Sequence, residues 1–280
     1  MNKILLTCLF FTSMAHGQII ELPYTLHNGW GSFEDPLFMG ITLIKSNPDD
    51  DSQNRQMPIK GLPDGFVVEK ISTDVFQLVW QDYTSGKISR EKLSGYMNAW
   101  ELDTLSENLT REFIRCYVHV AFKKENDGTY LYMVDTNNDL DFSDETIRSA
   151  VMYDQNRLND LYDKHVVSFT YDAFTGGEVQ SKQGEILIFE ADSNNKEFNN
   201  DFVYSFPHHG KTTLVHDGTE HELTFLFNSG LLLQAESSVA VQRVADNTYY
   251  YLTENITFDT TGYRVVGVNP RKEVLLLERF

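Results

Sequence analysis

The sequence predicts an all-β fold, an antiparallel β-sandwich-like architecture with few short helices. Short runs of aromatic and β-branched residues recur along the 280 residues and are separated by Gly, Asn and Asp. Two of these separators, Asp127-Gly128 and Asp217-Gly218, are the dipeptides typical of tight β-hairpins. Helical periodicity is rare. This pattern favours packed antiparallel sheets, in one continuous domain or in two packed β halves.

Strands in the first half are expected around the first Asp-Gly hairpin and before it. In residues 113–122, apolar positions alternate with Arg115, Tyr117 and His119, as in a strand with two different faces. A polar loop is expected at 47–58, one short helix within 89–103, and about one helical turn within 143–154. The predicted strands are 36–44, 66–71, 75–80, 113–122 and 129–134.

The second half repeats this style and ends in two strands joined across residues 269–272. We expect an N-terminal β region at 18–160 and a C-terminal β region at 161–280, unless the two form one continuous domain. The other predicted strands are 165–171, 184–191, 211–216, 219–227, 230–236 and 248–254.

The first 17 residues have the order of a secretory signal peptide. Lys3 precedes an apolar run at 4–14, and Ala15 and Gly17 put small residues where a signal peptidase cuts, before Gln18. No later stretch is apolar enough for a transmembrane segment. The predicted location is the periplasm, the cell envelope or the extracellular space.

The charge and the cysteine content limit the classes of function. Residues 1–17 contain one lysine and no acid, so the formal charge of −18 becomes −19 after cleavage. A chain this acidic repels nucleic acid and favours cations. Cys116 is the one cysteine left after cleavage and lies in a strand-like run, so we expect an inert core residue.

Residues 134–146, VDTNNDLDFSDET, are the sharpest chemical feature. In a calcium loop, oxygen ligands alternate along a chain that wraps the ion, and Asp135, Asn137 and Asp139 fill the first three ligand positions. Leu140 stands where such loops need Gly, and Thr146 stands where they need Glu. We predict a structural Ca²⁺ held by Asp135, Asn137, Asp139, Asp141, Asp144 and Glu145. The alternative is a solvated turn in which Asp and Asn side chains cap their own backbone.

Four histidines gather in residues 208–221. If Asp217-Gly218 is a two-residue turn, His216 and His221 are diagonal neighbours on one face of a hairpin. They could hold zinc or copper with His208 or His209, but the spacing fixes no ligand geometry. We therefore favour a polar face of an edge hairpin.

Motifs for nucleophilic catalysis are absent: the sequence has no GxSxG and no CxxC. Tryptophans and a run of three tyrosines at 249–251 suit a core, or alternatively a sugar-binding platform beside paired carboxylates.

Two segments carry a family resemblance. Residues 128–145, GTYLYMVDTNNDLDFSDE, and residues 256–279, ITFDTTGYRVVGVNPRKEVLLLER, resemble the N-terminal β-rich region of exported TlpA-type thioredoxin-like (redoxin) proteins. The resemblance implies a periplasmic or cell-envelope domain associated with thiol–disulfide exchange. Because the sequence has neither CxxC nor a thioredoxin module, no catalytic residue is carried over.

The function predicted from the sequence is that of an exported, non-catalytic binding or accessory protein with a calcium-stabilised loop. Its partner would be a protein or a small molecule, not a nucleic acid. The alternatives are the N-terminal part of a thiol–disulfide oxidoreductase whose catalytic module is absent, and a carbohydrate-binding or glycoside-active protein.

Overall fold

The computed structural model confirms the all-β fold. It describes residues 17–31, 33, 39–41, 59–99, 109–152, 158–190, 202–227, 239–246, 248–251, 254–258, 260–269 and 272–280. Across these ranges the strands form four sheets, and the pairing is antiparallel except between β8 (Val151–Met152) and β10 (Glu178–Glu190). No helix in the described ranges has the length and apolar character that crossing a membrane requires.

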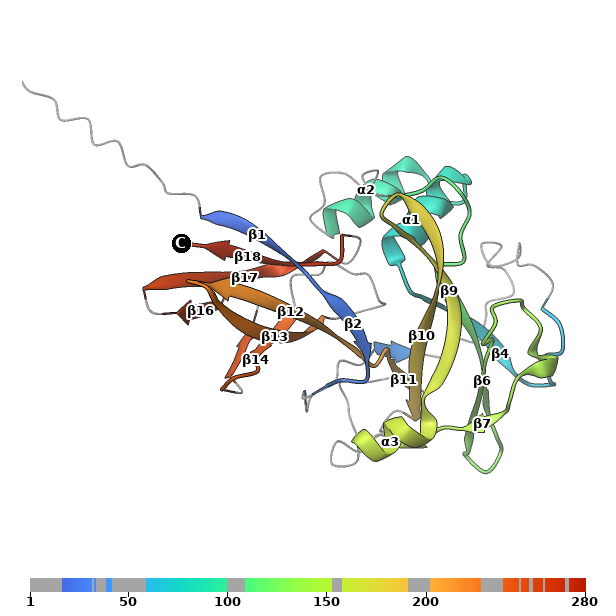
Figure 1. The fold of residues 1–280 in the computed structure, drawn as a ribbon. Coiled ribbons are helices and arrows are strands. Elements are labelled where there is room, and N and C mark those ends of the chain that lie inside the picture. The colour runs from blue at the N-terminus through green and yellow to red at the C-terminus, as the bar shows by residue number, and fades with distance from the viewer. Residues whose placement is uncertain are drawn as a thin grey trace, which may run out of the picture.

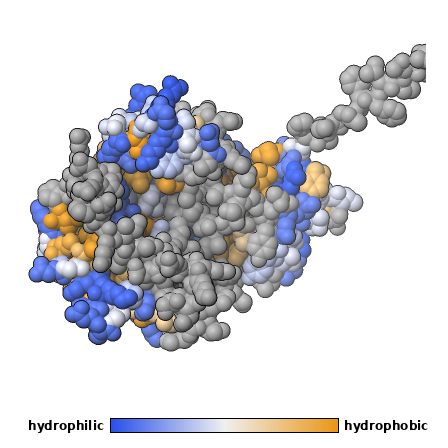
Figure 2. All heavy atoms as spheres, turned by 180° about the vertical axis from the view of Figure 1, so that it is seen from behind, coloured by the Kyte–Doolittle hydropathy of each residue, from blue (hydrophilic) through white to orange (hydrophobic). Residues whose placement is uncertain are grey.

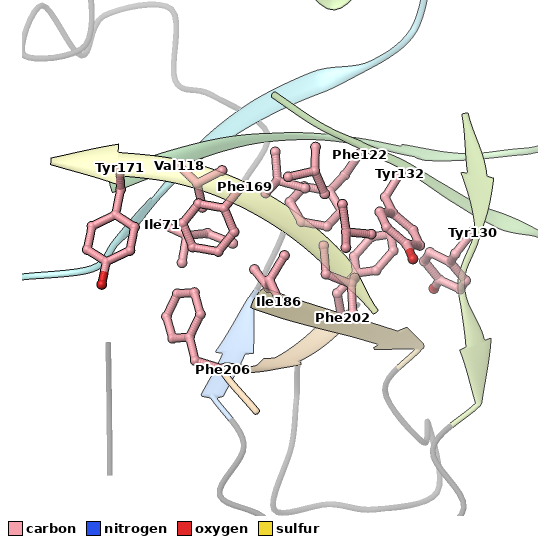
Figure 3. Packing of buried hydrophobic residues seen from close by; sticks show 14 of the residues in the cluster. Ile71, Val118, Phe122, Tyr130, Tyr132, Phe169, Tyr171, Ile186, Phe202 and Phe206 are labelled. Carbon is pink, nitrogen blue, oxygen red and sulfur yellow. The ribbon is translucent and has the colours of Figure 1, made fainter. Parts of the chain in front are cut away.

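The first sandwich packs two sheets around an aromatic core. One sheet has the order β4–β5–β6–β7, with bounds Val67–Ser72, Tyr117–Lys124, Tyr130–Val134 and Arg148–Ser149. The other has the order β3–β11–β10–β8, with β9 also paired to β10; the bounds are Met39–Ile41, Phe202–Ser205, Glu178–Glu190, Val151–Met152 and Val167–Thr175. Figure 3 shows Phe122, Tyr132, Phe169 and Phe202 pointing into the space between these sheets.

The second sandwich contains both the first and the last described strands. One sheet has the order β1–β18–β17–β16, with bounds Gln18–Pro23, Val274–Arg279, Thr261–Asn269 and Asn255–Phe258. The other has the order β15–β14–β13–β12–β2, with bounds Thr248–Tyr251, Val239–Arg243, Thr219–Phe227, His208–His216 and Thr25–Asn28. Its core is mainly aliphatic and includes Leu214, Leu223, Leu275 and Leu277. Figure 1 shows β1 lying beside β18, although the two strands are far apart in the sequence.

A third apolar cluster joins the two sandwiches. Leu187, Phe189 and Val203 lie on the face of the β10 sheet that points away from the aromatic core, and they pack with Leu161 of α3 (Leu158–His165) and Leu226 of β13. The first sandwich therefore takes its strands from residues 39–205, and the second takes its strands from residues 18–28 and 208–279. The domain boundary at residue 160 stays a prediction.

Both Asp-Gly hairpins form where the sequence predicted them. Asp217 and Gly218 have φ values of 46° and 78°, which suit a two-residue turn whose twist matches the flanking strands. The resulting register pairs His216 with Thr219 and Leu214 with His221, as expected.

Residues 75–80, predicted as a strand, instead begin helix α1 (Val75–Thr84); that prediction was wrong. Asp74 is the N-cap, and its side-chain oxygen accepts a hydrogen bond from Gln77 N at 3.0 Å. The helix buries Phe76 and Val79 against Leu93 of α2 (Arg90–Ala99), which lies within the predicted helical segment. The missed signal was an N-cap Asp followed by Gln three residues later, since β-branched and aromatic residues alone favoured a strand.

Several expectations fall outside the described residues: the signal sequence up to residue 16, the loop at 47–58, the strand at 230–236 and most of the strand at 36–44.

Candidate metal-binding loop and the histidine hairpin

The acidic loop, Asp135–Glu145, begins where β6 ends. Asp135 continues the strand pairing by one residue, since its backbone N donates a hydrogen bond to His119 O of β5 at 2.9 Å. The loop then passes over the outer face of the β4–β7 sheet and closes in a short 3₁₀ turn at Phe142–Asp144. Phe142 packs with Phe66, Ala121 and Met133 on that face, so a buried apolar side chain holds the loop in place.

Asp135 is the buried centre of this loop, with no exposed surface. One carboxylate oxygen accepts a hydrogen bond from Asp139 N and the other from Leu140 N, both at 3.0 Å. Burial raises the pKa of Asp135 to about 6; these two hydrogen bonds lower it in part, and the charges of Asp139 and Glu145 raise it. Asp135 therefore organises the backbone of the loop.

His119 is a neighbour of Asp135 that the sequence reasoning missed. Its Nδ1 lies 3.8 Å from Asp135 Oδ2, and burial lowers the pKa of the imidazole to about 4, so the ring is neutral at pH 7. The hairpin register pairs Val120 with Val134, which places residues 119 and 135 opposite each other. Counting outward from a two-residue Asp127-Gly128 turn would have paired residue 135 with residue 120 instead. The observed loop holds three residues, 126–128, since Glu125 lies opposite Thr129, and this shifts the register by one position.

Three of the six predicted ligands converge at the exposed side of the loop. The amide nitrogen Nδ2 of Asn137 lies 3.1 Å from Asp139 Oδ2 and 3.3 Å from Asp144 Oδ2. A single donor therefore bridges two carboxylates that would otherwise repel each other. Asn137 Oδ1 accepts a hydrogen bond from Asp139 N at 3.1 Å, so both ends of the amide contact Asp139.

Two further predicted ligands make hydrogen bonds inside the loop. Asp141 Oδ1 accepts hydrogen bonds from Ser143 N at 3.0 Å and Ser143 Oγ at 2.6 Å, and these bonds lower the pKa of Asp141. Glu145 Oε1 accepts hydrogen bonds from Thr136 N at 2.6 Å and Thr136 Oγ1 at 2.8 Å. Within the ranges that the structure describes, the second oxygen of each carboxylate accepts no hydrogen bond. Their role as metal ligands stays a prediction.

Leu140 adopts the backbone conformation that calcium loops usually assign to glycine. Its φ is 66°, although a positive φ costs a leucine on the order of 1 kcal/mol. The surroundings offset this cost: the side chain is only 7% exposed, and Leu140 O accepts a hydrogen bond from Lys60 N at 2.9 Å. The departure from the motif at this position thus changes the residue but not the backbone.

The segment at 59–66 clamps the acidic loop from outside. Lys60 O accepts a hydrogen bond from Phe142 N at 2.9 Å. Gly61 has a φ of 63°, and a Cβ atom there would lie 2.3 Å from Ser143 N. Only glycine fits this close approach of two backbones.

Among the residues that the structure describes, no three His, Cys, Asp or Glu side chains come together as a metal-binding group. The side chains that converge in the acidic loop are two carboxylates and one amide, and an amide is not among the residue types of such a group. Amide oxygens and carboxylates are ligands that calcium accepts.

The histidine hairpin, β12 and β13, does not bring its four histidines together. His216 and His221 both pack on the ring of Phe258, with centroids 5.4 Å and 4.2 Å from it. His216 Nδ1 also lies 3.0 Å from the Tyr263 hydroxyl. His208 and His209 lie at the other end of β12, about 26 Å away for eight residues of extended strand. A metal site that joins His216 and His221 with His208 or His209 is therefore ruled out, because the extended strand keeps the two ends apart.

The remaining candidates lie in cores. Cys116 is fully buried, and burial raises the pKa of its thiol, so the expectation of an inert core cysteine fits its surroundings. Trp30 is buried in the cluster between the sandwiches, and Trp80 is half-buried against Tyr83; Trp100 lies outside the described residues. Figure 2 views the molecule from behind and shows the coloured hydrophobic residues of that side in small groups among hydrophilic ones.

Comparisons with protein-family models, with curated proteins and with solved structures found no match to this chain. The resemblance to the TlpA-type region stays a prediction.

Proposed function

We propose that this chain is an exported, non-catalytic binding or accessory protein whose acidic loop holds one structural Ca²⁺. The observation that carries the proposal is the convergence of Asn137, Asp139 and Asp144, with one amide nitrogen 3.1 Å and 3.3 Å from two carboxylate oxygens. A cation at this place would neutralise the two carboxylates, and a turned amide would offer its oxygen as a third ligand.

Calcium suits this arrangement better than magnesium or zinc. The donors are all oxygens and come from a short, irregular loop, and calcium accepts varied oxygen geometry. Magnesium demands near-ideal octahedral geometry, and zinc prefers nitrogen and sulfur donors. Backbone carbonyls and waters would complete the coordination.

The role of the ion would be to hold the loop between two parts of the first sandwich. The loop contacts β9 through a hydrogen bond from Thr170 N to Thr136 O at 2.8 Å, and it contacts the 59–66 segment through Lys60. An ion that binds only the folded loop stabilises the fold by mass action, by about 2.7 kcal/mol at a hundredfold excess over its Kd.

Thermal unfolding of the mature protein in excess calcium and in chelator tests the proposal. We expect a higher Tm in calcium, and we expect Asp139→Asn and Asp144→Asn each to reduce this difference. Asp127→Asn is the matched control, since Asp127 is an exposed hairpin aspartate on the same sheet that accepts a hydrogen bond from Thr129 N. Magnesium at the same concentration controls for ionic strength.

Equal Tm values in calcium and chelator for the wild type would sink the calcium site. A calcium effect that survives both loop substitutions would place the ion elsewhere in the chain.

A further inference from the structure

Gln18 is the residue at which the predicted processed chain and the fold both begin. It is the first residue of β1 and pairs with Arg279 of β18. Its side chain is exposed, and within the described ranges no hydrogen bond to its carboxamide is found. The preceding Gly17 is tightly placed, because a Cβ there would lie 2.5 Å from Glu278 Cγ and 2.8 Å from Arg279 O.

We infer that Gln18 becomes the N-terminal residue on export and closes to pyroglutamate. The inference rests on the export in the proposed function. The free α-amine attacks Cδ of the side-chain carboxamide, a five-membered lactam forms, and Nε2 leaves as ammonia. The step needs no oxidant and no second substrate.

The position in the fold gives this modification a consequence. β1 is an edge strand with β18 as its one partner in the sheet, and its inward side chains include Ile20 and Leu22 of the second core. Edge strands and chain ends are where fraying and proteolysis concentrate. A lactam has no free amine, so aminopeptidases cannot start on the strand that covers this core. The lactam keeps one N–H and removes one positive charge.

Expression of the full chain with its own leader, followed by intact mass and N-terminal peptide analysis of the exported protein, tests the inference. We expect a chain that starts at residue 18 and is lighter than the unmodified sequence by one ammonia. Gln18→Asn is the matched control: it keeps a neutral amide, but its closure would need a four-membered ring. We expect this variant to keep its full mass and to lose N-terminal residues to an aminopeptidase that leaves the wild type intact.

A chain that starts at residue 18 with its full mass overturns this inference and leaves the proposed export standing. A chain that retains the leader, or starts elsewhere, overturns both.

Discussion

The acidic loop and the histidine hairpin are both rich in metal-ligating residue types, yet the fold treats them differently. In the loop, positive φ values at Asn138 and Leu140 curl the chain, so that side chains from residues 137, 139 and 144 meet. In the hairpin, extended strands keep His208 and His216 at opposite ends of β12. Residues close in sequence converge only where the backbone turns around a point. In a strand, side chains on the same face are two residues apart, and each one lies about 6.6 Å further along the strand than the one before.

A second contrast concerns what fills the centre of each region. Asp135 occupies the centre of the loop and binds two backbone N–H groups there. In the hairpin the two imidazoles of His216 and His221 both pack on the phenyl ring of Phe258. One region is organised by a polar side chain and the other by packing, and the four predictions below test that difference.

The largest effect is expected for Asp135→Ala. This change removes two hydrogen bonds to a buried carboxylate, at roughly 1.5–3 kcal/mol each, so we expect a loss of roughly 4 kcal/mol. Leu140 N loses its acceptor, whereas Asp139 N keeps its hydrogen bond to Asn137 Oδ1. Urea unfolding of the mature protein measures it. Asp127→Ala, at the exposed hairpin, should cost less than about 1 kcal/mol. A similar loss for both variants would show that Asp135 does not organise the loop.

Gly61→Ala tests the clamp on the loop. Its Cβ would lie 2.3 Å from Ser143 N, and its φ is 63°, so we expect a loss of about 3 kcal/mol by urea unfolding. Gly86→Ala is the matched control, since Gly86 has a φ of 76° but nothing within 4 Å of the added Cβ. The control measures backbone strain alone, about 1 kcal/mol. Equal losses would mean that the clamp contributes nothing.

The histidine hairpin should respond to pH through His208. The pKa of this imidazole is lowered to about 4, mainly by burial and also by the nearby His209, whereas a hydrogen bond that the ring donates to the backbone carbonyl of Phe206 raises it in part. Between the pKa of about 4 in the folded state and the pKa of about 6.5 in the unfolded state, the unfolded chain binds a proton that the folded chain does not. The free energy of unfolding therefore falls as the pH falls from 6.5 towards 4. We expect a loss of about 2 kcal/mol between pH 6.5 and 4.5.

Unfolding free energies measured across that pH range for wild type and His208→Gln check this result. The variant should have a shallower slope than the wild type. Parallel slopes would contradict the assignment to His208.

The smallest effect is expected for His221→Ala. The ring is partly exposed and packs on Phe258, so its removal should cost less than about 1 kcal/mol. Zinc should leave the Tm of wild type and variant equally unchanged, because His216 and His221 both pack on the phenyl ring of Phe258. A zinc-induced rise in Tm that disappears in the variant would instead restore a metal site to the hairpin.

The fold class could be read from the sequence because alternation and turn residues act locally. Asp127-Gly128 and Asp217-Gly218 located two hairpins, and the two-residue turn at Asp217-Gly218 also gave the register of its strands. At Asp127-Gly128 the loop holds three residues, so the register differs by one position from that of a two-residue turn. Helix α1 was missed, because a few β-branched and aromatic residues describe a strand and a buried helix equally well until packing against α2 decides.

The sequence by itself determined the strand-rich composition, the acidic character, and the group of oxygen-bearing side chains in residues 135–145. The tertiary structure alone decided that β1 joins β18 across the whole chain, since pairing over so long a separation depends on the core that both strands cover. It also decided the positive φ of Leu140. That conformation is unfavourable for leucine in isolation, and it is stable here because the side chain is buried and the Asp135 carboxylate and the Lys60 backbone hold it.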